Sequence, residues 1–151
     1  MTHTQIILLI AAILVLEALI WIPILAWLRR KSSLLAESLK DSVALSGERF
    51  IIEPEGALYR GGTGTYSRVK GNGVIALTDR RLIFKKLVGG DIEIPLVDIE
   101  KVSESKWFMR SYRSGRMHLI LHLRDGSEVG FIINNHDAWM RALESAVSQN
   151  G

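Results

Sequence analysis

Residues 73–87, GVIALTDRRLIFKKL, decide the fold class, because they contain two short apolar runs separated by a polar turn. Short runs rich in Val, Ile, Leu and Phe between turn residues are typical of β-strands. In a hairpin, Leu82 and Phe84 point toward a core, since alternate side chains share one face of a strand. The side chains of Thr78 and Asp79 can bond to nearby backbone groups in the turn. The stretch therefore predicts two antiparallel strands joined by a tight turn.

The same stretch is rich in positive charge, which allows two interpretations of its role. Four of the eleven side chains in residues 76–86 are cationic. The cluster either grips an anionic ligand or forms the solvated corner of an ordinary hairpin. Charge runs at turns are common by composition, so we favour the solvated turn. This secondary basic patch consists of Arg80, Arg81, Lys85 and Lys86.

Strand patterns continue on both sides of this hairpin and end in one helix. Residues 56–70 predict one or two strands broken by glycines, followed by an Asn-Gly hairpin turn at residues 70–73. Residues 135–151 follow the i, i+3, i+4, i+7 spacing of an amphipathic helix. We expect a mainly β curved sheet or barrel of about seven strands, closed by this C-terminal amphipathic helix. The later strand segments are 91–96, 99–108, 117–123 and 127–133.

The candidate core is clearest in the C-terminal third of the chain. Apolar residues alternate on both sides of an Arg-Asp-Gly turn in residues 117–133, which is typical of half-buried antiparallel strands. The inward-facing residues of these strands and of the helix are Leu119, Leu121, Leu123, Val129, Phe131, Ile133, Trp139, Ala142, Leu143, Ala146 and Val147.

Four motifs of the β segment fit one known family. They are GVIALTDRRLIF (73–84), IEIPLVDIEKV (92–102), LRDGSEVGFII (123–133) and WMRALESAV (139–147). Together they resemble the GRAM and bacterial PH-like domains. The resemblance covers about residues 48–148 and implies a seven-stranded PH-like (GRAM) barrel, with residues 48–151 as the domain and the C-terminal helix capping one end.

The resemblance also implies a class of function. Members of this family are mostly non-catalytic modules that bind lipids or proteins, and they are often tethered to membranes. Phosphoinositide-binding PH domains usually carry basic residues on both strands around the first hairpin turn. Here Arg68 and Lys70 precede that turn, whereas residues 74–78 carry no base.

The N-terminus predicts a membrane anchor. Residues 6–28, IILLIAAILVLEALIWIPILAWL, contain a single charge, Glu17. At roughly 1.5 Å per residue, a helix of this length crosses a hydrocarbon core of about 30 Å. The leader holds no Lys or Arg, and a basic triplet (Arg29, Arg30, Lys31) follows the run, which favours a retained anchor over a cleaved signal peptide. We therefore predict a transmembrane anchor at residues 1–28.

The distribution of charge predicts the orientation of this anchor. Every Lys and Arg lies beyond residue 28, and cytoplasmic flanks of membrane helices collect these residues. We expect a single-pass protein of the cell membrane, with its N-terminus outside and its C-terminal domain in the cytoplasm. The absence of cysteine fits a reducing compartment.

Two further features of the N-terminal region have alternative interpretations. Glu17 is costly inside a bilayer, so it is either a transmembrane partner contact or a tolerated residue. That partner would be a membrane protein complex or a second copy of the chain. Residues 29–47 show helical spacing at Leu35, Leu39 and Val43. We favour a solvated juxtamembrane helical stalk over a short self-association helix, because the apolar stripe is narrow.

The loop SKWFMRSYRSGR, residues 105–116, is the strongest functional candidate, because it mixes cations with aromatic residues and contains no acid. In one interpretation Trp107 and Met109 point inward, which leaves an ordinary basic hairpin tip. In the other, the aromatics sit at headgroup depth and the cations attract anionic lipid headgroups. The candidate lipid-binding residues are Lys106, Trp107, Phe108, Arg110, Tyr112, Arg113 and Arg116.

Motifs for catalysis or metal binding do not assemble in the sequence. His118 and His122 share a strand face, but four residues separate them by about 13 Å, too far for one metal ion. The glycine run at residues 61–64 is not followed by Gly-Lys-Ser/Thr, and the chain has neither a Gly-x-Ser-x-Gly elbow nor a cysteine. We therefore expect a protein that is not an enzyme and has no cofactor.

Net charge narrows the choice of partner. The chain carries 19 basic and 16 acidic residues, a net charge of +3. This balance is too mild and too interspersed to predict nucleic-acid binding, but it favours an anionic membrane surface. We expect a membrane-anchored cytoplasmic module that binds an anionic surface or a protein partner as a scaffold. The alternative is a small accessory subunit recruited through the transmembrane helix.

Overall fold

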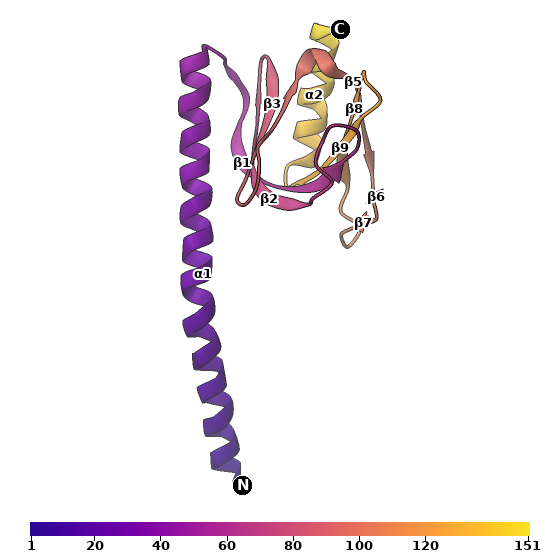
Figure 1. Ribbon diagram of the computed structural model, residues 1–151. Coiled ribbons are helices and arrows are strands. Elements are labelled where there is room, and N and C mark those ends of the chain that lie inside the picture. The colour runs from indigo at the N-terminus through magenta and orange to yellow at the C-terminus, as the bar shows by residue number, and fades with distance from the viewer.

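The computed structural model describes residues 1–151 as a long N-terminal helix and a β-rich domain beside its C-terminal end (Figure 1). The helices are α1 (His3–Ser46), the single 3-10 turn η1 (Leu96–Asp98) and α2 (His136–Asn150). The strands are β1 (Phe50–Gly62), β2 (Gly71–Thr78), β3 (Arg81–Lys86), β4 (Ile92–Pro95), β5 (Ile99–Ser105), β6 (Trp107–Phe108), β7 (Ser111–Tyr112), β8 (His118–Leu123) and β9 (Glu128–Ile133).

Seven of the strands form one curled antiparallel sheet in the order β4-β3-β2-β1-β9-β8-β5. The long strand β1 connects the two halves of the sheet, because it pairs with β2 along most of its length and with β9 from Ala57 to Gly62. Register shifts in β1 bend it, as β-bulges do, and the sheet curls around its inner face. Strands β6 and β7 form a separate hairpin between β5 and β8.

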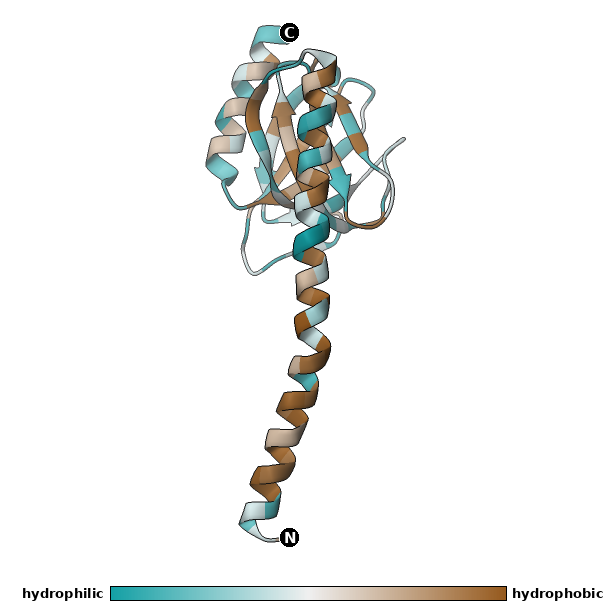
Figure 2. Cartoon of the chain, turned by 90° about the vertical axis from the view of Figure 1, so that its left-hand side faces the viewer, coloured by the Kyte–Doolittle hydropathy of each residue, from teal (hydrophilic) through white to brown (hydrophobic).

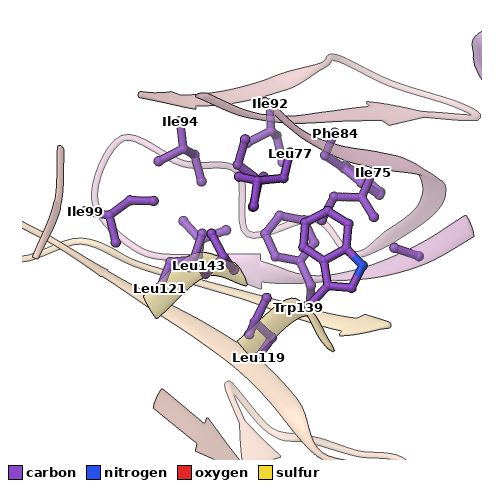
Figure 3. Close-up of a cluster of buried hydrophobic side chains, with 14 of the residues drawn as sticks. Ile75, Leu77, Phe84, Ile92, Ile94, Ile99, Leu119, Leu121, Trp139 and Leu143 are labelled. Atoms are coloured by element: carbon purple, nitrogen blue, oxygen red, sulfur yellow. The ribbon is translucent and has the colours of Figure 1, made fainter. Parts of the chain in front are cut away.

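The concave face of the sheet is filled by one apolar core, which α2 closes from the open side. Rings from three strands meet there, with centroids of Tyr59, Phe84 and Phe131 between 5.4 and 5.8 Å apart. Trp139 and Leu143 of α2 point into the same cluster and are fully buried (Figure 3). The alternation predicted for β8 and β9 and the helical stripe predicted for α2 are thus confirmed.

The Asn-Gly hairpin turn predicted at residues 70–73 is wrong. Residues 71–73 belong to β2, where Asn72 pairs with Leu58 of β1, and the connection between the strands is the longer segment 63–70. Gly73 serves a different need, since a Cβ there would collide with the carbonyl of Lys85 and the ring of Phe84. The glycine permits close strand packing and not a turn.

The predicted strand 99–108 is divided in two. Strand β5 ends at Ser105, and the chain re-enters a separate ladder at Trp107. The break falls in a run of four polar residues, 103–106, which the predicted strand had included.

Helix α1 contains an apolar half that touches nothing else in the molecule. The helix begins with a capping box between Thr2 and Gln5 and is capped at its C-terminus by Gly47, whose φ of +72° is left-handed. It is long and apolar enough to cross a membrane once, and its most apolar window is 0% buried. Figure 2 shows this half as a mostly hydrophobic rod projecting from the domain.

The C-terminal end of α1 packs against the outer face of the sheet. Leu39 and Val43 are buried against Ala76 of β2 and Ile83 of β3. Full burial of a Leu or Val side chain contributes about 1.5–3 kcal/mol, so this contact is a structural part of the domain. The interpretation of residues 29–47 as a solvated stalk is therefore wrong for its last two turns, because the sheet offers an apolar strip on its outer side.

Candidate functional site

The segment with the mixed aromatic and basic composition forms a tight hairpin. Strands β6 and β7 pair Trp107 with Tyr112 and Phe108 with Ser111. The two residues between the strands, Met109 and Arg110, have φ values of +45° and +61°. Two left-handed residues in succession match the twist of a two-residue hairpin turn.

One face of this hairpin is attached to the outer surface of β8 and β9. The ring of Phe108 covers Gly130, where any Cβ would collide with it, and only 6% of Phe108 is exposed. The sulfur of Met109 lies against Gly61. Gly130 therefore supplies the niche that fixes the hairpin on the sheet.

The other face presents an aromatic pair to solvent. The rings of Trp107 and Tyr112 stack at 4.7 Å between centroids, and the residues remain 63% and 49% exposed. The alternative in which Trp107 and Met109 both point inward is wrong for Trp107, because the hairpin turn places Phe108 on the buried side instead. The arrangement leaves a large apolar surface unpartnered.

Four cations lie close to the aromatic pair in the sequence. Lys106, Arg110 and Arg113 are exposed and make no ion pair, and Arg116 donates to the side-chain oxygen of Asn134 at 2.9 Å. No acidic side chain occurs within residues 105–116. The predicted residues thus come together on one hairpin, except that Phe108 faces the sheet.

A network of polar side chains also attaches this hairpin to the sheet. His118 is fully buried, and its two ring nitrogens lie 3.1 Å from the Ser105 carbonyl and 3.0 Å from the Ser111 hydroxyl. Arg60 donates from Nε to the same hydroxyl at 2.7 Å. Burial lowers the pKa of His118 below its ordinary value, and the nearby positive charge of Arg60 acts in the same direction.

Most cations of the secondary basic patch contact other groups of the same chain. Arg81 binds Glu48 at 3.0 Å and Glu93 at 2.7 Å. Burial would raise the pKa of Glu48, but hydrogen bonds from Thr78 and Arg81 hold that pKa below its ordinary value.

The other cations of this patch are also accounted for, except one. Lys85 donates to the Ser38 hydroxyl of α1. Lys86 is buried, donates to the Val69 carbonyl and lies 4.7 Å from the centroid of the Tyr59 ring. Only Arg80 is exposed without a side-chain partner, at the turn whose backbone is bonded by the Thr78 hydroxyl.

Glu17 lies in the apolar half of α1 with its side chain exposed and without a contact from the rest of the chain. Nothing else in the chain compensates a charge there.

A hydrogen-bonded row of polar residues also crosses the outer face of the sheet. The Ser103 hydroxyl lies 2.6 Å from Nε2 of His122, and Nδ1 of His122 lies 3.3 Å from the carboxylate of Glu128. The order Ser-His-Glu is that of a nucleophilic relay. The five main surface hollows are lined by other residues.

The hairpin lies at the end of the domain that faces the N-terminal, apolar half of α1 (Figure 1). The C-terminus of α2 lies at the opposite end (Figure 1). Since α1 is fixed to the sheet through Leu39 and Val43, the aromatic pair and the apolar rod have a defined relative placement.

Sequence reasoning missed the elements that hold the hairpin, namely Arg60, His118 and Gly130. A weak signal was available for the last two. Gly130 interrupts a strand, and a glycine in that position often marks a close approach. His118 alternates with core leucines and so lies on the outer face.

Comparison with known proteins supports the fold and gives no function. No protein-family model and no curated protein matches the sequence. The chain is similar in structure to a crystal structure of the C-terminal domain of an unknown protein from Leishmania infantum, with a TM-score of 0.56 and 15% sequence identity. That similarity covers 74% of this chain and 96% of the other.

Proposed function

We propose that this protein is a single-pass membrane protein whose GRAM/PH-like domain contacts an anionic membrane surface through the β6–β7 hairpin. The domain acts in the cytoplasm as a non-enzymatic binding or scaffold module, and the N-terminus is outside. The observation that carries the proposal is the exposed Trp107–Tyr112 pair, flanked by cations in the sequence, at the end of the domain that faces the apolar half of α1.

The physical argument combines two contributions. Aromatic rings with polar edges are favoured at the boundary between headgroups and acyl chains. Each Lys or Arg near an anionic leaflet gains about 1 kcal/mol, so four cations contribute up to about 4 kcal/mol. The fixed packing of α1 on the sheet adds to this, because it keeps the hairpin at the membrane with little loss of entropy.

The test uses the full chain in lipid nanodiscs and follows the fluorescence of Trp107. Trp21 and Trp27 are replaced by Phe, and Trp139 remains as a constant background because it is fully buried. Lipids that carry a quencher at headgroup depth should quench Trp107 in anionic discs. The quenching should weaken in high salt, which screens exposed charges, and in zwitterionic discs.

A matched pair of charge variants separates the hairpin from general basicity. Replacing Arg110, Arg113 and Arg116 together by Ser should abolish the quenching. Replacing Arg80, Lys101 and Arg141 by Ser removes the same charge from exposed positions elsewhere and should leave the quenching nearly unchanged. Equal quenching in anionic and zwitterionic discs, or an equal loss in both variants, would refute the proposed contact.

A second function, recruitment as an accessory subunit, is favoured by Glu17. An unpaired carboxyl in a membrane helix is expected to bond to a partner helix. The Glu17→Leu variant should then lose association with a differently tagged second copy, or with a co-purifying membrane protein, in mild detergent. Leu16→Val, at the neighbouring position, is the control and should retain it. Unchanged association in the Glu17→Leu variant would identify Glu17 as a tolerated residue.

A further inference from the structure

The β6–β7 hairpin is bonded to a buried histidine, His118 of β8. The bonding pattern around His118 closes only in one way. Nδ1 carries the proton and donates to the Ser105 carbonyl, the Ser111 hydroxyl donates to Nε2, and Arg60 donates to the Ser111 oxygen. Every donor then has an acceptor, and the site holds a single positive charge, that of Arg60.

A second proton on His118 disrupts this arrangement. Nε2 becomes a donor and can no longer accept the Ser111 proton, so the Ser111 hydroxyl loses its acceptor. In addition, only the Ser111 hydroxyl separates the positively charged His118 ring from the Arg60 guanidinium.

The other charged groups around His118 do not relieve this repulsion. Lys70, from the β1–β2 connection, and His136, at the start of α2, are the further titratable groups whose charge acts on His118, and both are bases. The carboxylate of Glu104 on β5 is bound to His136 at 2.6 Å. Strands β6 and β7 contribute no acidic residue.

We propose that His118, Ser111 and Arg60 form a pH-sensitive latch that holds the β6–β7 hairpin on the sheet at neutral pH and releases it in acid. Release withdraws Phe108 from its niche over Gly130, so the free hairpin presents Phe108 and Met109 in addition to Trp107 and Tyr112. The released hairpin inserts its apolar residues more deeply into an adjacent bilayer. The latch stands on its own geometry, whereas this last step rests on the proposed function.

The sign of the effect follows from linkage. A base whose pKa is lower in the latched state than in the released state favours release once protons bind. The latch is therefore closed above the ordinary histidine pKa of about 6.5 and weakens as pH falls through the lower, latched value. The latching constant falls by up to about tenfold for each unit of pKa difference between the two states.

The latch is tested by amide hydrogen exchange of residues 106–116 in the full chain, held in zwitterionic nanodiscs. Protection factors, corrected for the pH dependence of intrinsic exchange, should fall between pH 7.5 and pH 5, while those of α2 remain constant. His118→Leu should remove the pH dependence. His122→Gln, on the same strand face, should retain it.

Two Arg60 variants keep the test informative even if His118→Leu misfolds. Arg60→Gln removes the neighbouring charge and so reduces the difference between the latched and released pKa of His118, and the loss of protection between pH 7.5 and pH 5 should therefore be smaller than in the parent chain. Arg60→Lys preserves the charge, and its loss of protection should be nearer that of the parent chain. Constant protection of the hairpin in the parent chain from pH 7.5 to pH 5, or an equal loss in the Gln and Lys variants, would overturn the latch.

The Trp107 quenching assay distinguishes failure of the latch from failure of the membrane contact. In anionic nanodiscs, acid should shift quenching of Trp107 toward lipids labelled deeper in the acyl chain. If protection falls in acid but Trp107 is never quenched, the latch stands and the membrane contact is refuted. If Trp107 is quenched identically at both pH values and protection is constant, the contact stands and the latch is refuted.

Discussion

Two basic clusters of this chain have similar composition and opposite structural roles. In the first, at residues 80–86, Arg81 is held by two carboxylates, and Lys86 is buried over an aromatic ring. In the second, at residues 106–116, three of four cations have no side-chain partner. The difference teaches that the number of cations in a segment says little about its function. What matters is whether the fold brings acids and carbonyl groups to them.

The acidic partners of the first cluster come from a distance in the sequence. Glu48 lies 33 residues before Arg81 and is brought to it where β1 begins. The second cluster projects on a separate hairpin, and its nearest strand neighbours offer a histidine and a glycine. Charge on the hairpin is therefore available to a partner outside the chain.

The largest expected loss of stability follows removal of the Glu48 carboxylate, which pairs with Arg81 in the first cluster. Glu48→Ala should lower the free energy of unfolding of the β domain by about 3 kcal/mol, because it leaves Arg81 partly buried with an incomplete set of partners. Denaturation followed by Trp139 fluorescence measures this. Glu100→Ala, at an exposed position on β5, should change it by less than about 0.5 kcal/mol. Equal effects of the two variants would contradict the structural role of the first cluster.

The next effect concerns the helix that packs behind the first cluster. Leu39→Ala should destabilise the β domain by about 2 kcal/mol, at the low end for a buried leucine because the contact involves few residues. Leu45→Ala, on an exposed part of α1, should cost less than about 0.5 kcal/mol in the same denaturation experiment. If both variants unfold like the parent chain, α1 does not pack on the sheet in solution.

Acid should weaken the first cluster by less than removal of Glu48 does. The pKa of Glu48 is depressed in the folded state, so its contribution is complete above the ordinary value of 4.5 and is lost as pH falls through the lower folded value. A protonated carboxyl can still bond to Thr78, which limits the loss. Unfolding measured down to pH 3 should show a smaller pH dependence in Glu48→Gln than in the parent chain, and an identical dependence would count against this assignment.

The smallest expected change in the free energy of unfolding is the one caused by removing cations from the second cluster. Arg110→Ala together with Arg113→Ala should change the free energy of unfolding by less than about 0.5 kcal/mol, because exposed cations without partners stabilise nothing inside the domain. The measurement is the same denaturation experiment in zwitterionic detergent. A loss comparable to that of Glu48→Ala would show that these cations are structural after all, and would remove the contrast between the clusters.

The sequence by itself determined most of the fold. Alternation of apolar residues in strands β8 and β9 and the helical stripe of α2 specify which faces are buried, because these periods are local properties of strands and helices. The apolar run of residues 6–28 likewise determined the one helix able to cross a membrane. The local sequence gave a wrong prediction at residues 71–73, where the Asn-Gly pair predicted a turn but the glycine is required for close packing of strands.

Only the tertiary structure decided what the charged and aromatic residues do. Whether Trp107 or Phe108 faces outward depends on two left-handed residues in the hairpin and on a niche at Gly130, which lies 22 positions beyond Phe108. Whether Arg81 or Arg113 is free depends on carboxylates brought by other strands. In the sequence, the apolar stripe that contains Leu39 and Val43 is too narrow to predict a packing partner. The structure shows that these residues pack against the outer face of β2 and β3. These outcomes depend on contacts between segments distant in the chain, and pattern within one segment carries no information about them.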